Sequence, residues 1–172
     1  MQFYLMSERT MGDPSPSADW RLPWTGSCRC GRVALRSTEP PLLVGVCHCT
    51  GCQKMSASAF SLSIAVPGEG FSTSGLEPEI GGLHGKARHH FCPWCKSWMF
   101  TRVEGMDQFV NVRASMFDDH AWVVPYVEFW TSEKLPWAKT GASLSFEREP
   151  EPAAFADLIA AFAREGVRPG AS

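Results

Sequence analysis

The sequence contains no long apolar run and no block of like charge. No hydrophobic stretch approaches the roughly 18 residues that a membrane-spanning helix needs. Residues 1–11 also lack the apolar stretch of a secretory signal peptide. Sixteen basic residues against eighteen acidic ones give a formal charge of −2, with no basic stripe for phosphate backbones. We therefore expect no membrane partner and no nucleic acid as the main partner.

Cysteine is absent outside three tight groups. All seven cysteines lie in the segments Cys28–Cys30, Cys47–Cys52 and Cys92–Cys95. Disulfides need Cα atoms roughly 4.4–6.8 Å apart with suitably aimed Cβ atoms, which extended Cys-x-Cys neighbours rarely provide. An odd number of cysteines would also leave one thiol over in an oxidising compartment. The grouping favours reduced or metal-bound thiols, and hence a cytoplasmic location.

Zinc fits the spacing of these thiols better than redox chemistry does. Cys92 and Cys95 form a Cys-x-x-Cys pair, but the segment 96–103 that follows has the pattern of a strand. Thioredoxin-like pairs open a helix instead, and ferredoxins use other spacings. Four thiolates saturate a tetrahedral zinc, whereas three leave one position open. Seven cysteines therefore suggest one closed and one open site, although spacing alone does not assign them.

Short strands dominate the predicted secondary structure. The clearest runs from Phe60 to Val66, where large apolar residues alternate with small ones. Further strands are expected at 32–37, 42–49, 98–103, 109–113 and 126–130, the third and fourth of these forming a hairpin. We expect Phe71–Thr73 to pair back after a turn, and the glycines at 75, 81, 82 and 85 to mark a loop.

One segment has a convincing helical pattern. From Pro152 to Glu165, apolar residues recur at spacings of three and four, and Gly166 follows as a C-cap. The sequence therefore predicts a flexible arm (1–19), a mainly β zinc-binding domain (20–148), and a C-terminal helix with its tail (149–172). No internal repeat is present.

Five motifs in this order resemble those of the glutathione-dependent formaldehyde-activating enzyme (GFA) family, which includes centromere protein V-like proteins. They are Gly26-Ser-Cys-Arg-Cys-Gly-Arg-Val33, Val46-Cys-His-Cys-Thr-Gly-Cys-Gln-Lys54, Phe91-Cys-Pro-Trp-Cys95, Met116-Phe-Asp-Asp119 and Pro125–Trp137. The resemblance implies an Mss4-like β-tent of short antiparallel sheets joined by zinc. It also implies a carbon–sulfur lyase-type reaction that joins glutathione to formaldehyde.

The resemblance further assigns the cysteines to two zinc ions per chain. One would be a structural zinc, held by Cys28, Cys30, Cys92 and Cys95. The other would be a labile catalytic zinc, held by Cys47, Cys49 and Cys52. An open zinc position can favour the thiolate of a substrate thiol or polarise an aldehyde oxygen. The alternative is a non-catalytic zinc-binding module with a protein or nucleic-acid partner.

Several residues beside the cysteines have simpler interpretations. His48, between two cysteines on an extended backbone, is expected to face away from the metal as a structural hydrogen bonder. His89 or His90 could support a zinc-bound sulfur of the third group. Trp94 is the best candidate for a contact with substrate or partner. Lys96 replaces the glycine usual in the family, at a cost of roughly 1 kcal/mol if φ is positive there.

Overall fold

The computed structural model describes residues 20–170. The arm expected at 1–19 and the last two residues lie outside the described residues. Trp20, the first described residue, is buried in the hydrophobic core. The domain boundary at residue 20 stays a prediction.

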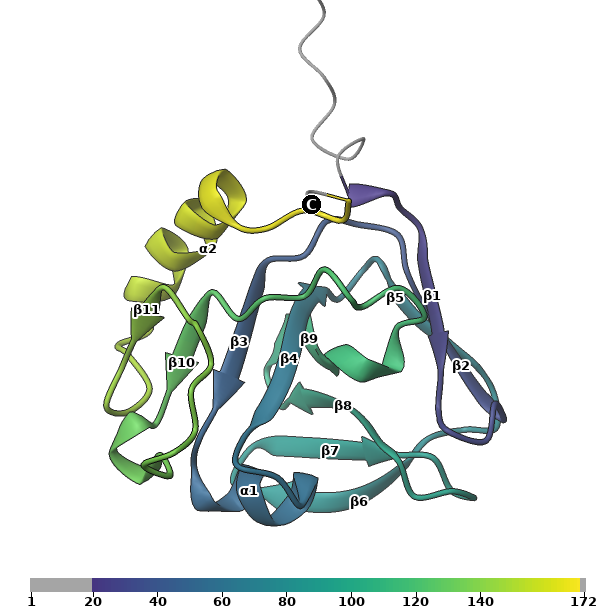
Figure 1. Cartoon of the computed structure of the whole chain (residues 1–172). Coiled ribbons are helices and arrows are strands. Elements are labelled where there is room, and N and C mark those ends of the chain that lie inside the picture. Colours follow the sequence, from purple (N-terminus) through teal and green to yellow (C-terminus); the bar gives the residue numbers. More distant parts are fainter. Residues whose placement is uncertain (1–19, 171–172) are drawn as a thin grey trace, which may run out of the picture.

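Three strands form the smaller sheet. They are β1 (Trp24–Ser27), β2 (Val33–Ser37) and β5 (Phe71–Gly75), in the order β1-β2-β5. Both pairs are antiparallel. The segment 71–73, which we expected to pair back onto the strand before it, instead joins β2 in this separate sheet. Figure 1 shows the smaller sheet at the right of the molecule.

Eight strands form the larger sheet, in the order β11-β10-β3-β4-β9-β8-β7-β6. In chain order they are β3 (Leu43–Cys47), β4 (Ser61–Pro67), β6 (Glu79–His84), β7 (Ala87–Phe91), β8 (Trp98–Val103), β9 (Met106–Arg113), β10 (Val127–Phe129) and β11 (Leu144–Ser145). Neighbours are antiparallel, except that β10 runs parallel to both β3 and β11. The predicted mainly β fold is thus confirmed, with its strands in two sheets, and so is the β8–β9 hairpin.

Strand β6 occupies the segment whose glycines had predicted a loop, and that expectation is wrong. Glycine suits position 81 of this strand because a Cβ there would come within 2.7 Å of the Phe91 ring. The β6–β7 register also shifts between Ile80 and Gly82. These glycines permit close approach of a neighbouring ring at a bulge, which composition alone does not distinguish from a turn.

The side chains of the larger sheet divide between two faces, because successive residues of a strand point to opposite sides. Directly paired residues share a face. The core face carries the paired apolar residues Val44, Ile64, Val112 and Phe100. It packs with the smaller sheet, including Val33 and Leu35. The opposite face carries Cys47, Ser61, Ser63, Arg113, Thr101 and His89.

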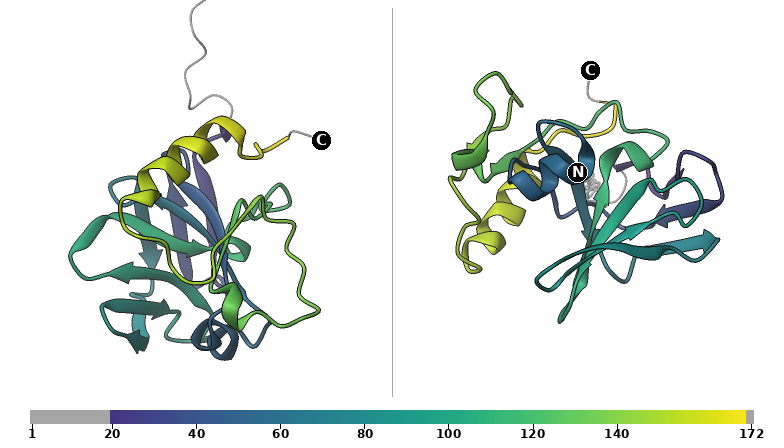
Figure 2. Two further views of the ribbon diagram at one scale, coloured as in Figure 1. Left: turned by 90° about the vertical axis from the view of Figure 1, so that its left-hand side faces the viewer. Right: turned by 90° about the horizontal axis from the view of Figure 1, so that it is seen from below.

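Helix α2 (Ala154–Glu165) confirms the predicted C-terminal helix, starting two residues later than expected. Its buried Phe162 packs against Trp20 and Tyr126, and Phe155 contacts Phe129 of β10. Figure 2 shows α2 on the outside of the molecule. Among residues 20–170, no helix is long and apolar enough to cross a membrane.

Helix α1 (Thr50–Ser56) was not expected from the sequence. It follows β3 directly and lies near β6 and β7 (Figure 1), beside the face of the larger sheet that carries Cys47 and His89. A Cβ built on Gly82 of β6 would lie 3.6 Å from the Met55 sulfur and 3.5 Å from the His89 ring. Residues 20–170 also contain the short 3-10 helices η2 (Ala114–Met116) and η3 (Thr131–Glu133).

Candidate metal centres

The four-cysteine group joins turns from the two sheets. Cys28 and Cys30 lie between β1 and β2, and Cys92 and Cys95 lie between β7 and β8. Their four sulfur atoms lie within 4.8 Å of one another. Two of the separations are 3.5 Å (Cys28–Cys30) and 3.8 Å (Cys30–Cys92). A tetrahedral zinc with Zn–S bonds of roughly 2.3 Å places its sulfurs about 3.8 Å apart. The group therefore suits a closed zinc site.

Neighbouring donors favour the thiolate form of two members of this group, Cys28 and Cys95. For Cys30, a backbone hydrogen bond from Arg32 would lower the pKa, but burial and the neighbouring thiols outweigh it and raise the pKa to about 11. The Val33 amide donates to the Cys28 sulfur at 3.4 Å, and the Ser97 hydroxyl lies 3.3 Å from the Cys95 sulfur. Burial alone would raise the pKa of both thiols, but the hydrogen bonds outweigh it, lowering the pKa of Cys28 and bringing that of Cys95 to about 5. Metal ligation needs thiolates, so these donors prepare the group for a cation.

Lys96, next to the last cysteine, has a φ of 57°, so the condition under which a lysine strains this turn is met. Its amide donates to the Cys92 carbonyl at 3.0 Å and closes the turn. We expect Lys96→Gly to be about 1 kcal/mol more stable than Lys96→Ala, because glycine adopts positive φ without a Cβ clash. Both variants lose the exposed ion pair with Glu79, which contributes little.

Urea unfolding of the two zinc-loaded Lys96 variants provides the measurement. Because both lack the lysine side chain, their difference isolates the backbone effect. An alanine variant as stable as the glycine variant would show that the turn is not strained.

Trp94 is exposed, with 64% of its surface accessible. The Arg32 guanidinium lies 3.8 Å from the centroid of its ring. One face of the indole is therefore already covered by a cation. A contact of Trp94 with substrate or partner stays a prediction.

The three-cysteine group is local in sequence. Cys47 ends β3, Cys49 is the N-cap of α1, and Cys52 lies in the first helical turn. The Cys52 amide donates to the Cys49 sulfur at 3.4 Å, and all three sulfurs lie within 4.8 Å of one another. Within the described chain, no further His, Cys, Asp or Glu joins this cluster. All three cysteines are half-buried, so the group combines thiolate donors with access from solvent.

The thiols of this group differ in acidity. Hydrogen bonding with the Cys47 thiol lowers the pKa of Cys52 to about 5, with help from the positive charge of Arg113. The same contact, together with burial, raises the pKa of Cys47, while burial raises that of Cys49. The three-cysteine group thus holds one thiolate readily, and a bound cation would favour ionisation of its other two thiols.

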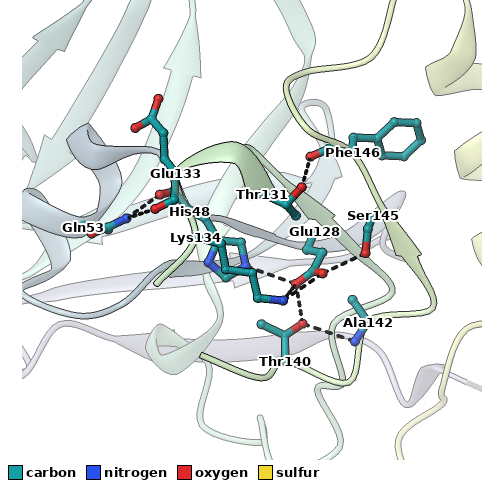
Figure 3. Close-up of polar contacts among 10 residues, drawn as sticks. All are labelled: His48, Gln53, Glu128, Thr131, Glu133, Lys134, Thr140, Ala142, Ser145 and Phe146. Carbon is teal, nitrogen blue, oxygen red and sulfur yellow. Dashed lines mark hydrogen bonds and ion pairs between the residues drawn. The ribbon is translucent and has the colours of Figure 1, made fainter. Parts of the chain in front are cut away.

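His48, between two ligands of the three-cysteine group, is fully buried and faces Glu128, as Figure 3 shows. Its Nε2 lies 3.1 Å from Glu128 Oε2, and its amide donates to the Phe129 carbonyl at 3.0 Å. The expectation that His48 is a structural hydrogen bonder is confirmed. The carboxylate therefore fixes the segment that connects Cys47 to Cys49.

Glu128 accepts hydrogen bonds from three further side chains (Figure 3). Lys134 Nζ lies 2.9 and 2.7 Å from its two oxygens, Thr140 donates at 2.8 Å and Ser145 at 2.7 Å. Burial alone would raise the pKa of this carboxyl, but the hydrogen bonds outweigh burial and lower it to about 2. Glu128 is therefore an ionised, fully bonded centre beside the metal-ligand segment.

Segment η3 also holds the start of α1. The Thr50 amide donates to Glu133 Oε2 at 2.5 Å. Gln53 Nε2 donates to the His48 carbonyl at 2.6 Å and to the Glu133 carbonyl at 3.0 Å (Figure 3). These bonds join a loop more than 70 residues away in sequence to the three-cysteine group. Sequence reasoning missed Glu128 and Glu133, since nothing local marks them as neighbours of the cysteines.

The remaining candidates make other contacts or are exposed. His89 Nδ1 lies 2.9 Å from Thr101 Oγ1, and His90 stacks on Phe100. Among the described residues, neither histidine hydrogen-bonds to a sulfur, so the expectation that one supports the third cysteine group is wrong. Lys54 is exposed on α1, as expected of a surface lysine.

Two clusters of thiols on a mainly β scaffold define a protein suited to binding two thiophilic metal ions. The chain belongs to the family of glutathione-dependent formaldehyde-activating enzymes, whose model matches residues 23–133, well over half of the sequence. A crystal structure of a protein from Rhodobacter sphaeroides is similar, with a TM-score of 0.44 and 16% identity. That similarity covers 55% of this chain and 88% of the other. Among curated proteins, none matches the sequence.

Proposed function

We propose that this protein is a zinc-dependent enzyme of the carbon–sulfur lyase type that joins glutathione to formaldehyde, giving S-(hydroxymethyl)glutathione. Family membership supports a glutathione-dependent formaldehyde-activating function. The observation that carries the proposal is the contrast between the two thiol clusters. One offers four sulfurs, and the other offers three half-buried sulfurs without a fourth protein ligand in the described chain.

The clusters would divide the roles. Cys28, Cys30, Cys92 and Cys95 would hold a structural zinc, and Cys47, Cys49 and Cys52 a catalytic one. Zinc at the three-cysteine cluster would favour the thiolate of a bound thiol and polarise an aldehyde oxygen. The Glu128 and Glu133 contacts would keep the segment carrying the three thiols in place.

The reaction itself needs no redox cofactor. The glutathione sulfur forms a bond to the carbonyl carbon, and the carbonyl π pair moves to oxygen. The proton lost by the thiol is balanced by one gained at that oxygen. We further propose a zinc-binding domain (20–148), a C-terminal helix with its tail (149–172), and a cytoplasmic location, where glutathione is abundant.

Cobalt-substituted protein allows a direct test with glutathione. We expect two metal ions per chain, one resisting mild chelation and one leaving readily. Adding glutathione should intensify the sulfur-to-metal charge-transfer absorption, because a fourth sulfur joins the open centre. S-methylglutathione, which lacks the free thiol, is the matched control and should leave the spectrum unchanged.

Two outcomes would contradict the proposal. A single metal site after full reconstitution would reject the division into closed and open centres. A spectrum that millimolar glutathione does not change, with the three-cysteine centre still loaded, would favour the non-catalytic zinc-binding module. Product formation from glutathione and formaldehyde, followed by NMR, tests the reaction itself.

A further inference from the structure

Arg113 lies on the same face of the larger sheet as the three-cysteine group. It ends β9, where it pairs with Ser63 of β4, and Cys47 pairs with Ser61 two residues earlier on β4. Paired residues share a face, and residues two apart on one strand share it as well. The register therefore directs the Arg113 and Cys47 side chains to the same side, diagonally across one strand.

The contacts of Arg113 leave its charge without a carboxylate partner. Its guanidinium lies 4.1 Å from the centroid of the Trp98 ring, and Nη2 donates to the Asn111 carbonyl at 3.5 Å. Arg113 is half-buried, and its Nε is buried without a hydrogen-bond partner. In the described part of the chain, no Asp or Glu oxygen lies within 4.0 Å of it.

The negative groups that act on Arg113 are the cysteines. Burial lowers the pKa of this arginine to about 10, and the charges of Cys52 and Cys47 oppose that decrease. The guanidinium therefore stays protonated at neutral pH. His89, its other titratable neighbour, has a pKa lowered to about 4 by burial and by the Arg113 charge, so it is neutral there.

We propose that Arg113 is a positioning residue whose guanidinium offsets the negative charge of the Cys47, Cys49 and Cys52 thiolates. It thereby favours metal loading and sets the preference of the loaded centre for an anionic ligand over a neutral one. The effect on metal loading requires only that the three-cysteine group binds a metal. The second rests on the proposed function, in which the substrate enters as a thiolate.

Charge counting gives the sign of both effects. Three protonated thiols are neutral, and three thiolates with one divalent metal carry a net charge of −1. An added anionic ligand brings the net charge to −2, whereas a neutral ligand leaves it at −1. Each step that adds negative charge is stabilised by a nearby guanidinium in a partly desolvated environment. Without that guanidinium, metal affinity falls, and the affinity for anionic ligands falls again.

The first experiment measures zinc affinity by competition with a chromophoric chelator. Arg113→Gln and Arg113→Met remove the charge, and Met keeps an apolar stem over Trp98. Arg113→Lys keeps the charge. Arg102→Gln, on the adjacent strand β8 with its guanidinium over the Phe71 ring, is the matched control. We expect both neutral variants to bind the labile zinc roughly tenfold more weakly, with Lys and the control near the parent protein.

The second experiment compares two ligands of the cobalt-loaded protein, glutathione as the anionic ligand and imidazole as the neutral one. The neutral variants should lose roughly tenfold more affinity for glutathione than for imidazole. Equal losses for both ligands, or none, would overturn the charge-based role. If the parent protein binds no thiol, the proposed function fails, while the zinc competition still tests Arg113. Unchanged zinc affinity in a folded Arg113→Met protein would overturn the inference altogether.

Discussion

Replacing Cys95 with alanine is expected to leave the protein unfolded or insoluble. Cys95 belongs to the group that joins the β1–β2 turn of the smaller sheet to the β7–β8 turn of the larger one. Two of its partners, Cys28 and Cys92, are part of the hydrophobic core. Structural zinc binding contributes roughly 10–16 kcal/mol in small zinc peptides. A whole domain has a net stability of roughly 5–15 kcal/mol.

Cys52→Ala is the matched variant in the other cluster, and we expect it to remain folded. Its cluster lies within one short segment, from the end of β3 to the first turn of α1, so losing this ligand disconnects no distant elements. The variant should lose the labile metal and keep the structural one. Soluble yield, metal content and melting temperature measure the contrast. Equal melting temperatures for the two variants would contradict the assignment of roles.

Replacing Glu128 with glutamine is expected to destabilise the protein by about 3 kcal/mol, the usual range when one partner of a buried charge pair is removed. Glu128 is 6% exposed and accepts bonds from His48, Lys134, Thr140 and Ser145. The variant leaves the Lys134 ammonium without its carboxylate. Glu104→Gln, which removes an exposed ion pair with Arg88, is the control and should change stability by about 0.5 kcal/mol or less.

The stabilisation that Glu128 provides should decrease as pH falls. Its carboxyl has a pKa of about 2 when folded, against an ordinary value of 4.5. A lowered pKa stabilises the fold above the ordinary value, and that stabilisation is lost as pH falls through the folded one. The gap between the parent protein and Glu128→Gln should therefore be full at pH 7 and narrow from about pH 4.5 downward. Urea unfolding of both proteins across this range measures the gap.

Both proteins lose bound metal in acid, and this shared effect on stability cancels when the two are compared. His48 and Lys134 are the charged or titratable neighbours of Glu128 in the described chain. A gap that stays constant down to pH 3 would show that the network does not depend on an ionised carboxylate. If Glu128→Gln is as stable as Glu104→Gln, the hydrogen bonds of Glu128 contribute little to the free energy of unfolding.

The grouping of the metal ligands could be predicted from the sequence because ligand spacing is a local property. Cys-x-Cys and Cys-x-x-Cys pairs place two sulfurs near one point whatever the rest of the chain does. Which pairs meet is not local. The pairing of Cys28 with Cys92 depends on how the two sheets pack, and only the family resemblance suggested it.

Other features could not be predicted because distant contacts decide them. Helix α1 is short and buries none of its residues, so it has no apolar periodicity to detect. It is held at its start by a cysteine cap and by Glu133, whose position depends on η3. Arg113 and Glu128 become neighbours of the cysteines only through strand pairing with β4 and β3. Arg113 lies in none of the five motifs, and the motif Pro125–Trp137, which contains Glu128, does not show which residues that glutamate contacts.

Along the strands of the larger sheet, side chains alternate between the core face and the face with the three-cysteine group, and this alternation restricts insertions and deletions. Strands β3, β4 and β9 carry core residues and site residues at alternate positions, such as Ile64 beside Ser63 and Val112 beside Arg113. Adding or removing one residue in β4 would exchange the two faces beyond that point. Apolar side chains would then face the thiols, and serines would enter the core. Length changes in these strands should therefore be accepted only in pairs of residues, whereas the connecting loops face no such restriction.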